Sequence, residues 1–130
     1  ANEDIGVIPY SPLGGGLLTG KYSPTEKPDS GRLVENHMYA KRYGVDDYYQ
    51  TALDFTAHAK ESGYQPATLA VAWVMANPAI TAPIIGARNL EQLDGSLAAL
   101  DVNMTPDWYK QISDLSYTPA PANDRLEEAK

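Results

Sequence analysis

Two short strand-like segments that lie far apart in the chain constrain the fold most strongly. Residues 5–10 and 80–85 are brief apolar runs bordered by turn-forming residues, and helical patterns occupy the sequence between them. Strands separated by helices usually pair in parallel, and parallel sheets are normally larger and covered on both faces. Two such strands alone would leave both edges open, so the chain is expected to be a piece of a larger α/β domain.

Four helices are predicted from capping residues and apolar periodicity. They begin near residues 46–47, at Pro66, after Asn89 and at residues 105–107, and Gly63 is placed to end the first. The expected apolar faces are, in chain order, Tyr49, Leu53, Thr56 and Ala57; Ala70, Trp73 and Val74; Leu90, Leu93, Leu97 and Leu100; and Trp108, Ile112 and Leu115.

The remaining segments are irregular. Residues 11–45 are rich in glycine, proline, serine and tyrosine, and a loop of that length is usually functional or disordered. Residues 116–130 form a polar, proline-containing tail that is expected to fray. Pro9 and Pro83 cannot donate to a strand ladder, so both predicted strands are expected to be weak.

Composition excludes several classes of function. The 130 residues suit one small domain, and 10 basic against 17 acidic residues give a net charge of −7. That balance argues against nucleic-acid binding, which needs a basic face. The chain has no cysteine and only two distant histidines, so neither disulfides nor a transition-metal site is expected. No apolar run reaches the roughly 18 residues of a membrane span and no signal peptide is apparent, so a cytoplasmic location is expected.

The first segment with chemical potential runs from residue 10 to residue 22. It reads Tyr10-Ser11-Pro12-Leu13-Gly14-Gly15-Gly16-Leu17-Leu18-Thr19-Gly20-Lys21-Tyr22. Consecutive glycines let main-chain N–H groups approach an anion, and a lysine adds charge suited to phosphate. Taken alone, the segment is more typical of a flexible glycine-rich turn.

The second segment, residues 84–93, places Gly86 and Arg88 between a strand end and a helix start. A helix N-terminus has unpaired N–H groups and a positive dipole end, so phosphate binding there is physically natural. A polar turn with a solvated arginine is an equally good interpretation of this segment alone. Neither a Walker-type loop nor a G-x-G-x-x-G fingerprint is present.

Taken together, the two segments resemble the cofactor-binding signatures of the aldo-keto reductase family. Members look like Y-S-P-L-x-x-G-x-L-T-G-K-Y after barrel strand seven and I-I-G-A-R-x-x-x-Q-L after strand eight, and the likeness extends from about residue 5 to residue 115. The resemblance implies an α/β fold, namely a C-terminal fragment of a (β/α)8 TIM barrel, mostly helical with two short parallel strands. Residues 1–130 would then be an incomplete, cofactor-binding domain.

The resemblance also implies an NADP(H) site. Tyr10 would stack on the nicotinamide, and Gly86 and Arg88 would hold the 2′-phosphate. Gln92 would touch the adenosine end, and Ser96 stands at the adenine contact, where the family commonly has asparagine. The other implied contacts are to the pyrophosphate from residues 11–15, Lys21 and Arg32. The full set implied for cofactor binding is Tyr10, Ser11, Pro12, Leu13, Gly14, Gly15, Lys21, Arg32, Gly86, Ala87, Arg88, Gln92 and Ser96.

No catalytic residue is assigned to this chain. The family's catalytic tyrosine, aspartate, lysine and histidine lie on earlier strands, and His37 and His58 are interpreted as structural or solvated. The expected parent is an NADP-dependent enzyme that interconverts small carbonyl compounds and alcohols by hydride transfer, whereas the chain alone is expected to be inactive. A nicotinamide-sensing regulatory subunit is the alternative. Exposed strand edges also predict that the fragment self-associates or that residues 14–45 are disordered without cofactor.

Overall fold

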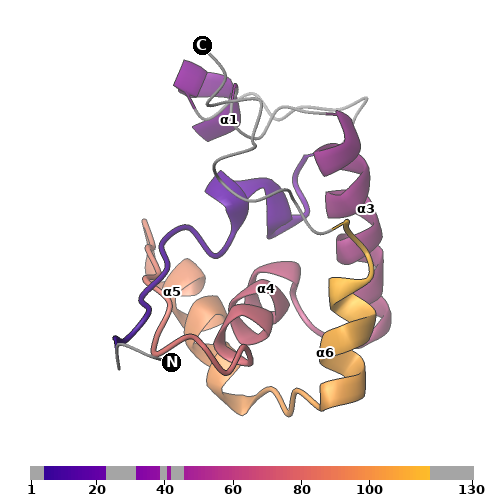
Figure 1. Ribbon diagram of the computed structural model, residues 1–130. Helices are drawn as coiled ribbons and strands as arrows, with labels where there is room; N and C mark the ends of the chain where they lie inside the picture. Colours follow the sequence, from indigo (N-terminus) through magenta and orange to yellow (C-terminus); the bar gives the residue numbers. More distant parts are fainter. Residues whose placement is uncertain (1–4, 23–31, 39–40, 42–45, 118–130) are drawn as a thin grey trace.

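The computed structural model describes residues 5–22, 32–38, 41 and 46–117 (Figure 1). The described elements are helical: the 3-10 helix η1 (Gly14–Thr19), α1 (Arg32–Glu35), α3 (Asp46–Glu61), α4 (Pro66–Met75), α5 (Leu90–Leu97), the 3-10 helix η2 (Ala98–Asp101) and α6 (Pro106–Ser113). Helices α3 and α6 lie along one side, α5 lies on the other, and α4 lies between them (Figure 1). No helix in this described part is long and apolar enough to cross a membrane.

The predicted strands over residues 5–10 and 80–85 do not form within the described part of the chain. Two isolated parallel bridges, Val7 with Ile80 and Tyr10 with Ile84, take their place. The N–H of Thr81 donates to the oxygen of Val7 at 2.8 Å, and Ile84 donates to Pro9 at the same distance. Proline at positions 9 and 83 removes N–H donors, and a lone pair of segments lacks the neighbours that stabilise a strand.

The core is built around α4. Five consecutive residues of this helix are buried, namely Thr68, Leu69, Ala70, Val71 and Ala72. Leu69 and Ala70 pack with Phe55 and Ala59 of α3 and Ile112 of α6. On another face, Val71 and Ala72 pack with Ala99 of η2. A helix buried on most sides must lie in the middle of its neighbours, and α4 therefore fixes where α3, α5 and α6 lie.

The predicted helix ends are confirmed where a local residue sets them. The side chain of Asn89 accepts from the N–H of Gln92 at 2.9 Å and begins α5. Thr105 accepts from the N–H of Trp108 at 3.3 Å and begins α6. Gly63 has a φ of +79°, the left-handed conformation typical of the residue that follows a helix.

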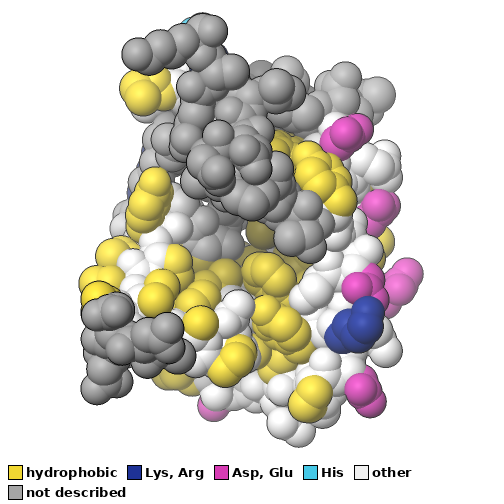
Figure 2. All heavy atoms as spheres, in the orientation of Figure 1, with side chains coloured by type: hydrophobic (Ala, Val, Ile, Leu, Met, Phe, Trp, Pro, Cys, Tyr) yellow, Lys and Arg dark blue, Asp and Glu magenta, His cyan; other side chains and the backbone are white. Residues whose placement is uncertain are grey.

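Two predicted apolar faces are wrong in part. Ala57 is exposed, and the buried face of α3 follows Tyr49, Ala52, Phe55, Thr56 and Ala59. In the stripe expected for residues 90–100, Leu90, Leu97 and Leu100 are exposed, while Leu93 is half-buried. Hydrophobic side chains gather where α5 and the bridged segments lie (Figure 2). An apolar stripe is buried only when a neighbouring element covers it.

The segment predicted as a long irregular loop contains structure. Helices η1 and α1 lie within residues 11–45, and η1 contacts α1, α3 and α4. Leu17 of η1 is buried with Tyr22, Leu33 and Tyr49. The first part of this segment is therefore anchored to the core. Residues 118–130 of the predicted tail lie outside the described residues.

Candidate functional site

One groove of about 610 Å³ lies between the two sequence motifs. Residues 10–21 form one wall, residues 84–96 form another, and α4 contributes to the floor. All but two of the predicted cofactor-binding residues line it: Tyr10, Ser11, Pro12, Leu13, Gly15, Lys21, Gly86, Ala87, Arg88, Gln92 and Ser96. Packing thus brings together two segments that are far apart in the sequence.

Two predicted residues are not among those that line the groove. The main-chain N–H of Gly14 turns back and donates to the oxygen of Ser11 at 2.9 Å. Arg32 begins α1, and its side chain lies outside the described part of the structure. A role for Arg32 at the groove therefore stays a prediction.

The glycine run is explained by main-chain conformation. Gly14, Gly15 and Gly16 have φ values of +55°, +68° and +102°, and Ser11 also lies in the left-handed region at +57°. Side chains disfavour that region, whereas glycine adopts it readily. A Cβ on Gly16 would meet Lys21 and Tyr22 at 3.8 Å, which is ordinary contact, so lack of space is not the constraint.

Two of the three glycine N–H groups donate within the segment itself and are not free for an anion. Gly14 donates to Ser11, and Gly16 donates to the oxygen of Leu13 at 3.0 Å. The turn closed by Gly16 has the left-handed Gly14 and Gly15 at its centre, whereas the turn closed by Gly14 has Leu13 at φ −95° and needs no left-handed central residue. Charged side chains at the groove must therefore provide much of the attraction for an anion.

Lys21 and Arg88 are the basic side chains that line the groove, and both are exposed. Within the described residues, neither has a carboxylate at ion-pair distance, and the ion pair that does form joins Lys110 to Asp114 on α6. The Lys21 ammonium lies 5.3 Å from the centre of the Tyr22 ring, which restricts its position. These two cations can attract an anionic ligand into the groove of an otherwise acidic chain.

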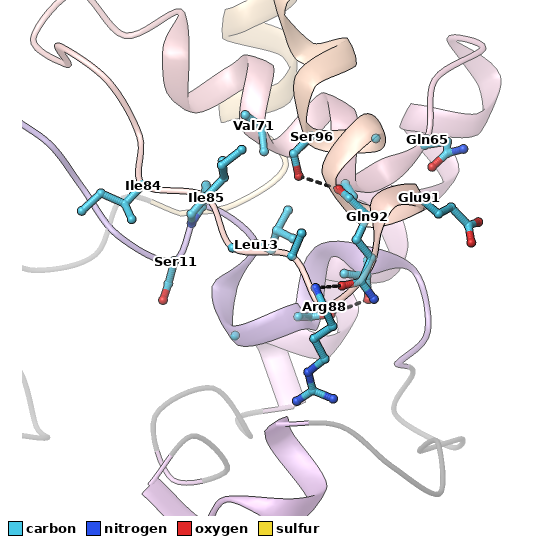
Figure 3. A pocket seen from close by; sticks show the side chains of 18 of the residues that line it. Ser11, Leu13, Gln65, Val71, Ile84, Ile85, Arg88, Glu91, Gln92 and Ser96 are labelled. Atoms are coloured by element: carbon cyan, nitrogen blue, oxygen red, sulfur yellow. Dashed lines mark hydrogen bonds between the residues drawn. The ribbon is translucent and has the colours of Figure 1, made fainter.

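The start of α5 is held by two hydrogen bonds of Gln92, one through its side chain and one through its main chain. The N–H of Arg88 donates to Gln92 Oε1 at 2.9 Å, and the N–H of Gln92 donates to Asn89 Oδ1 at 2.9 Å. The Arg88 guanidinium extends away from Gln92 and stays clear of this network (Figure 3). The main chain at Arg88 is therefore fixed, while its charged end is available for a ligand.

Ser96 forms a buried part of the groove. The residue is 5% exposed, and its hydroxyl donates to the main-chain oxygen of Gln92 at 3.0 Å. Nearby, the Thr68 hydroxyl donates to the oxygen of Gly95 at 2.6 Å and joins α4 to α5. The hydroxyl proton of Ser96 is therefore already used in a hydrogen bond within α5.

Several residues that line the groove were not predicted from the sequence. They are Gly16, Thr19, Gln65, Ala67, Val71, Ile84, Ile85, Asn89, Glu91 and Gly95. Some of them adjoin the two motifs, and extending each motif by a few residues would have included them. Those on or before α4 reach the groove only because α4 packs against α5, which no local sequence signal indicates.

The sequence profile described as the Aldo/keto reductase family matches residues 1–116. The chain belongs to the aldo/keto reductase family. The resemblance inferred from the two motifs is thereby confirmed, and the groove lies where those motifs meet.

Aldo/keto reductase relatives are similar over most of the chain. An uncharacterized oxidoreductase, YrpG of Bacillus subtilis (strain 168), is 36% identical over 95% of this chain and 35% of its own length. A probable voltage-gated potassium channel subunit beta of Arabidopsis thaliana is 37% identical over 78% of this chain and 31% of its own length. Protein tas of Escherichia coli (strain K12) is 30% identical, over 92% of this chain and 35% of its own length. The chain therefore spans about a third of the length of these curated relatives.

Proposed function

We propose that the groove binds NADP(H), and that the chain is the C-terminal cofactor-binding part of a (β/α)8-barrel aldo-keto reductase. The parent enzyme interconverts small carbonyl compounds and alcohols by hydride transfer. One observation carries this proposal: residues 10–21 and 84–96, which hold the two family-like motifs, line a single groove that contains Lys21 and Arg88.

The residues of the groove fit a phosphorylated dinucleotide. Tyr10 is 66% exposed at one end, so its ring offers a face for a nicotinamide to stack on. Lys21 supplies a compact charge suited to a pyrophosphate, and the Ser11 hydroxyl lies on the same wall. When bound, the nicotinamide supplies the hydride. The chain's own residues hold and orient the cofactor.

Arg88 favours NADP(H) over NAD(H). A guanidinium is planar and can donate two parallel hydrogen bonds to one phosphate. Arg88 follows a bridged segment and immediately precedes Asn89, the cap of α5, where the positive end of the helix dipole adds attraction for an anion. The 2′-phosphate is the group that distinguishes the two cofactors, and we propose that Arg88 binds it.

The exposed apolar surface supports the barrel assignment. Ile5, Val7 and Ile8 are exposed beside the bridges, and Leu97 and Leu100 are exposed at the end of α5 and in η2. A closed barrel would cover these side chains with further strands and helices. In the isolated chain they remain open, which also favours self-association.

Binding without turnover is the expected behaviour of the 130-residue chain. Isothermal titration should detect NADPH binding, while an assay of NADPH oxidation with a generic aldehyde should detect none, because the catalytic set lies elsewhere in the parent. Measurable turnover would show that the assignment of catalysis to another part is wrong. Absence of binding would remove the cofactor role altogether.

A regulatory subunit that senses the nicotinamide redox state is the second candidate. It is favoured by similarity to probable voltage-gated potassium channel beta subunits of Arabidopsis thaliana and Oryza sativa subsp. japonica. Both functions need the same groove. The full-length protein separates them when its catalytic tyrosine is replaced by phenylalanine. In an enzyme, this substitution abolishes turnover. In a sensor, it leaves cofactor binding and subunit assembly intact.

A further inference from the structure

Three amide side chains line the groove, and they differ in what they already bind. Asn89 Oδ1 accepts from the N–H of Gln92, and Gln92 Oε1 accepts from the N–H of Arg88. Gln65 also lines the groove. Within the described residues its side chain makes no hydrogen bond, so only its amide has both the oxygen and the nitrogen available to a ligand.

Gln65 does not serve the helix that follows it. It is the residue before α4, with φ −68° and ψ +138°, and its side chain caps no N–H of the helix. Serine, threonine, aspartate and asparagine are preferred at such positions because their short side chains reach those donors. The amide of Gln65 therefore has no evident role in folding.

Gln65 lies beside Gly95 at the groove. Its Oε1 lies 3.5 Å from the position that a Cβ on Gly95 would take. Since residue 95 has no side chain, nothing from that position covers the amide. Ser96 directs its hydroxyl proton inward to Gln92 and offers no donor in its place. In Figure 3, Gln65, Gln92 and Glu91 lie on the side of the view opposite Ser11 and Ile84.

We propose that Gln65 recognises the adenine base of the dinucleotide and is a specificity-determining residue of the site. An amide can pair with adenine through two hydrogen bonds: its oxygen accepts from the 6-amino group, and its nitrogen donates to ring nitrogen 7. This proposal rests on the proposed function and adds the side chain that recognises the adenine base. The 2′-phosphate on Arg88 and the base on Gln65 would then be held by different elements.

The test compares NADPH with its hypoxanthine analogue, in which a carbonyl oxygen replaces the 6-amino group. That oxygen would face Gln65 Oε1, so one of the two hydrogen bonds is lost. Calorimetric titration of the wild-type chain should show roughly fivefold tighter binding of NADPH than of the analogue. Gln65→Ala should bring the two affinities close together, because NADPH loses both hydrogen bonds to the amide and the analogue loses only the one to ring nitrogen 7.

Two further variants make the result specific. Gln111 is exposed on α6 and does not line the groove, so Gln111→Ala should keep the wild-type preference. Gln65→Thr supplies a good cap for α4, so it should unfold no earlier than wild type and yet lose the preference for adenine. This variant separates base recognition from any effect on folding.

The outcomes distinguish the two proposals. If Gln65→Ala and Gln65→Thr bind both dinucleotides with the wild-type ratio, base recognition by Gln65 is overturned while NADP(H) binding stands. If the wild-type chain binds both dinucleotides equally well, Gln65 is likewise excluded. If it binds neither, the proposed function itself fails, and with it the role of Gln65.

Discussion

The main-chain N–H of Arg88 donates to the side-chain oxygen of Gln92 at 2.9 Å. This hydrogen bond joins the turn after the second bridge to the first turn of α5. It fixes the main chain of Arg88 without using the guanidinium, so the charged group is positioned and still available. The pair connects the geometry of the helix start to the proposed recognition of phosphate.

Gln92→Ala should weaken binding of adenosine 2′,5′-bisphosphate by about two- to tenfold. The variant removes the acceptor that positions Arg88, and a neutral hydrogen bond contributes about 0.5–1.5 kcal/mol. Calorimetric titration measures the change, and Gln111→Ala serves as the matched control because its side chain is exposed and outside the groove. Unchanged affinity in Gln92→Ala would show that the hydrogen bond does not position Arg88.

Gly16→Ala should destabilise the chain by about 1–2 kcal/mol, because φ +102° is strained for any residue with a Cβ. Gly86→Ala is the control, since Gly86 has no left-handed φ and nothing lies within 4 Å of its added Cβ. Urea unfolding measures both variants. Equal stabilities of the two variants would mean that main-chain conformation is not what requires glycine at position 16.

His58→Ala should lower the free energy of unfolding by about 1–2 kcal/mol. The indole N–H of Trp108 donates to His58 Nε2 at 2.7 Å and joins α6 to α3, and the substitution leaves this half-buried donor without its partner. His37 is exposed, so His37→Ala should be neutral in the same urea titration. A His58→Ala chain as stable as His37→Ala would exclude a structural role for the histidine.

The isolated chain should self-associate at micromolar concentration. Its apolar surface includes Ile8 at 62% exposure and Leu100 at 69%, and the bridged segments leave open edges. Multi-angle light scattering should report an oligomer, and the double substitution Ile8→Lys and Leu100→Lys should shift it toward monomer. A wild-type monomer at these concentrations would contradict this expectation.

Local signals in the sequence predicted the local parts of the fold. Asn89, Thr105 and Gly63 each set a helix end through their own side chain or main-chain conformation, and each does so in the structure. Burial was harder to predict, since it depends on neighbours. Leu97 is exposed because nothing within the described residues covers it, although its spacing is typical of a buried stripe.

The groove was predictable only where the motifs run along it. Residues 10–21 and 84–88 carry recognisable patterns, and residues of both segments line the groove. Gln65 was missed because a glutamine before a proline carries no functional signal of its own. Its position follows from the packing of α4 against α5, which includes the hydrogen bond from Thr68 to Gly95.

The affinity of the 130-residue chain for NADPH and for NADH, with and without Arg88→Ala, tests the central claim most directly. Wild type should bind NADPH more tightly than NADH, and Arg88→Ala should remove roughly tenfold or more of NADPH affinity while leaving NADH nearly unchanged, since hydrogen bonds to charged groups contribute about 1.5–3 kcal/mol. Equal loss for both cofactors, or no loss for either, would contradict binding of the 2′-phosphate by Arg88 in this groove.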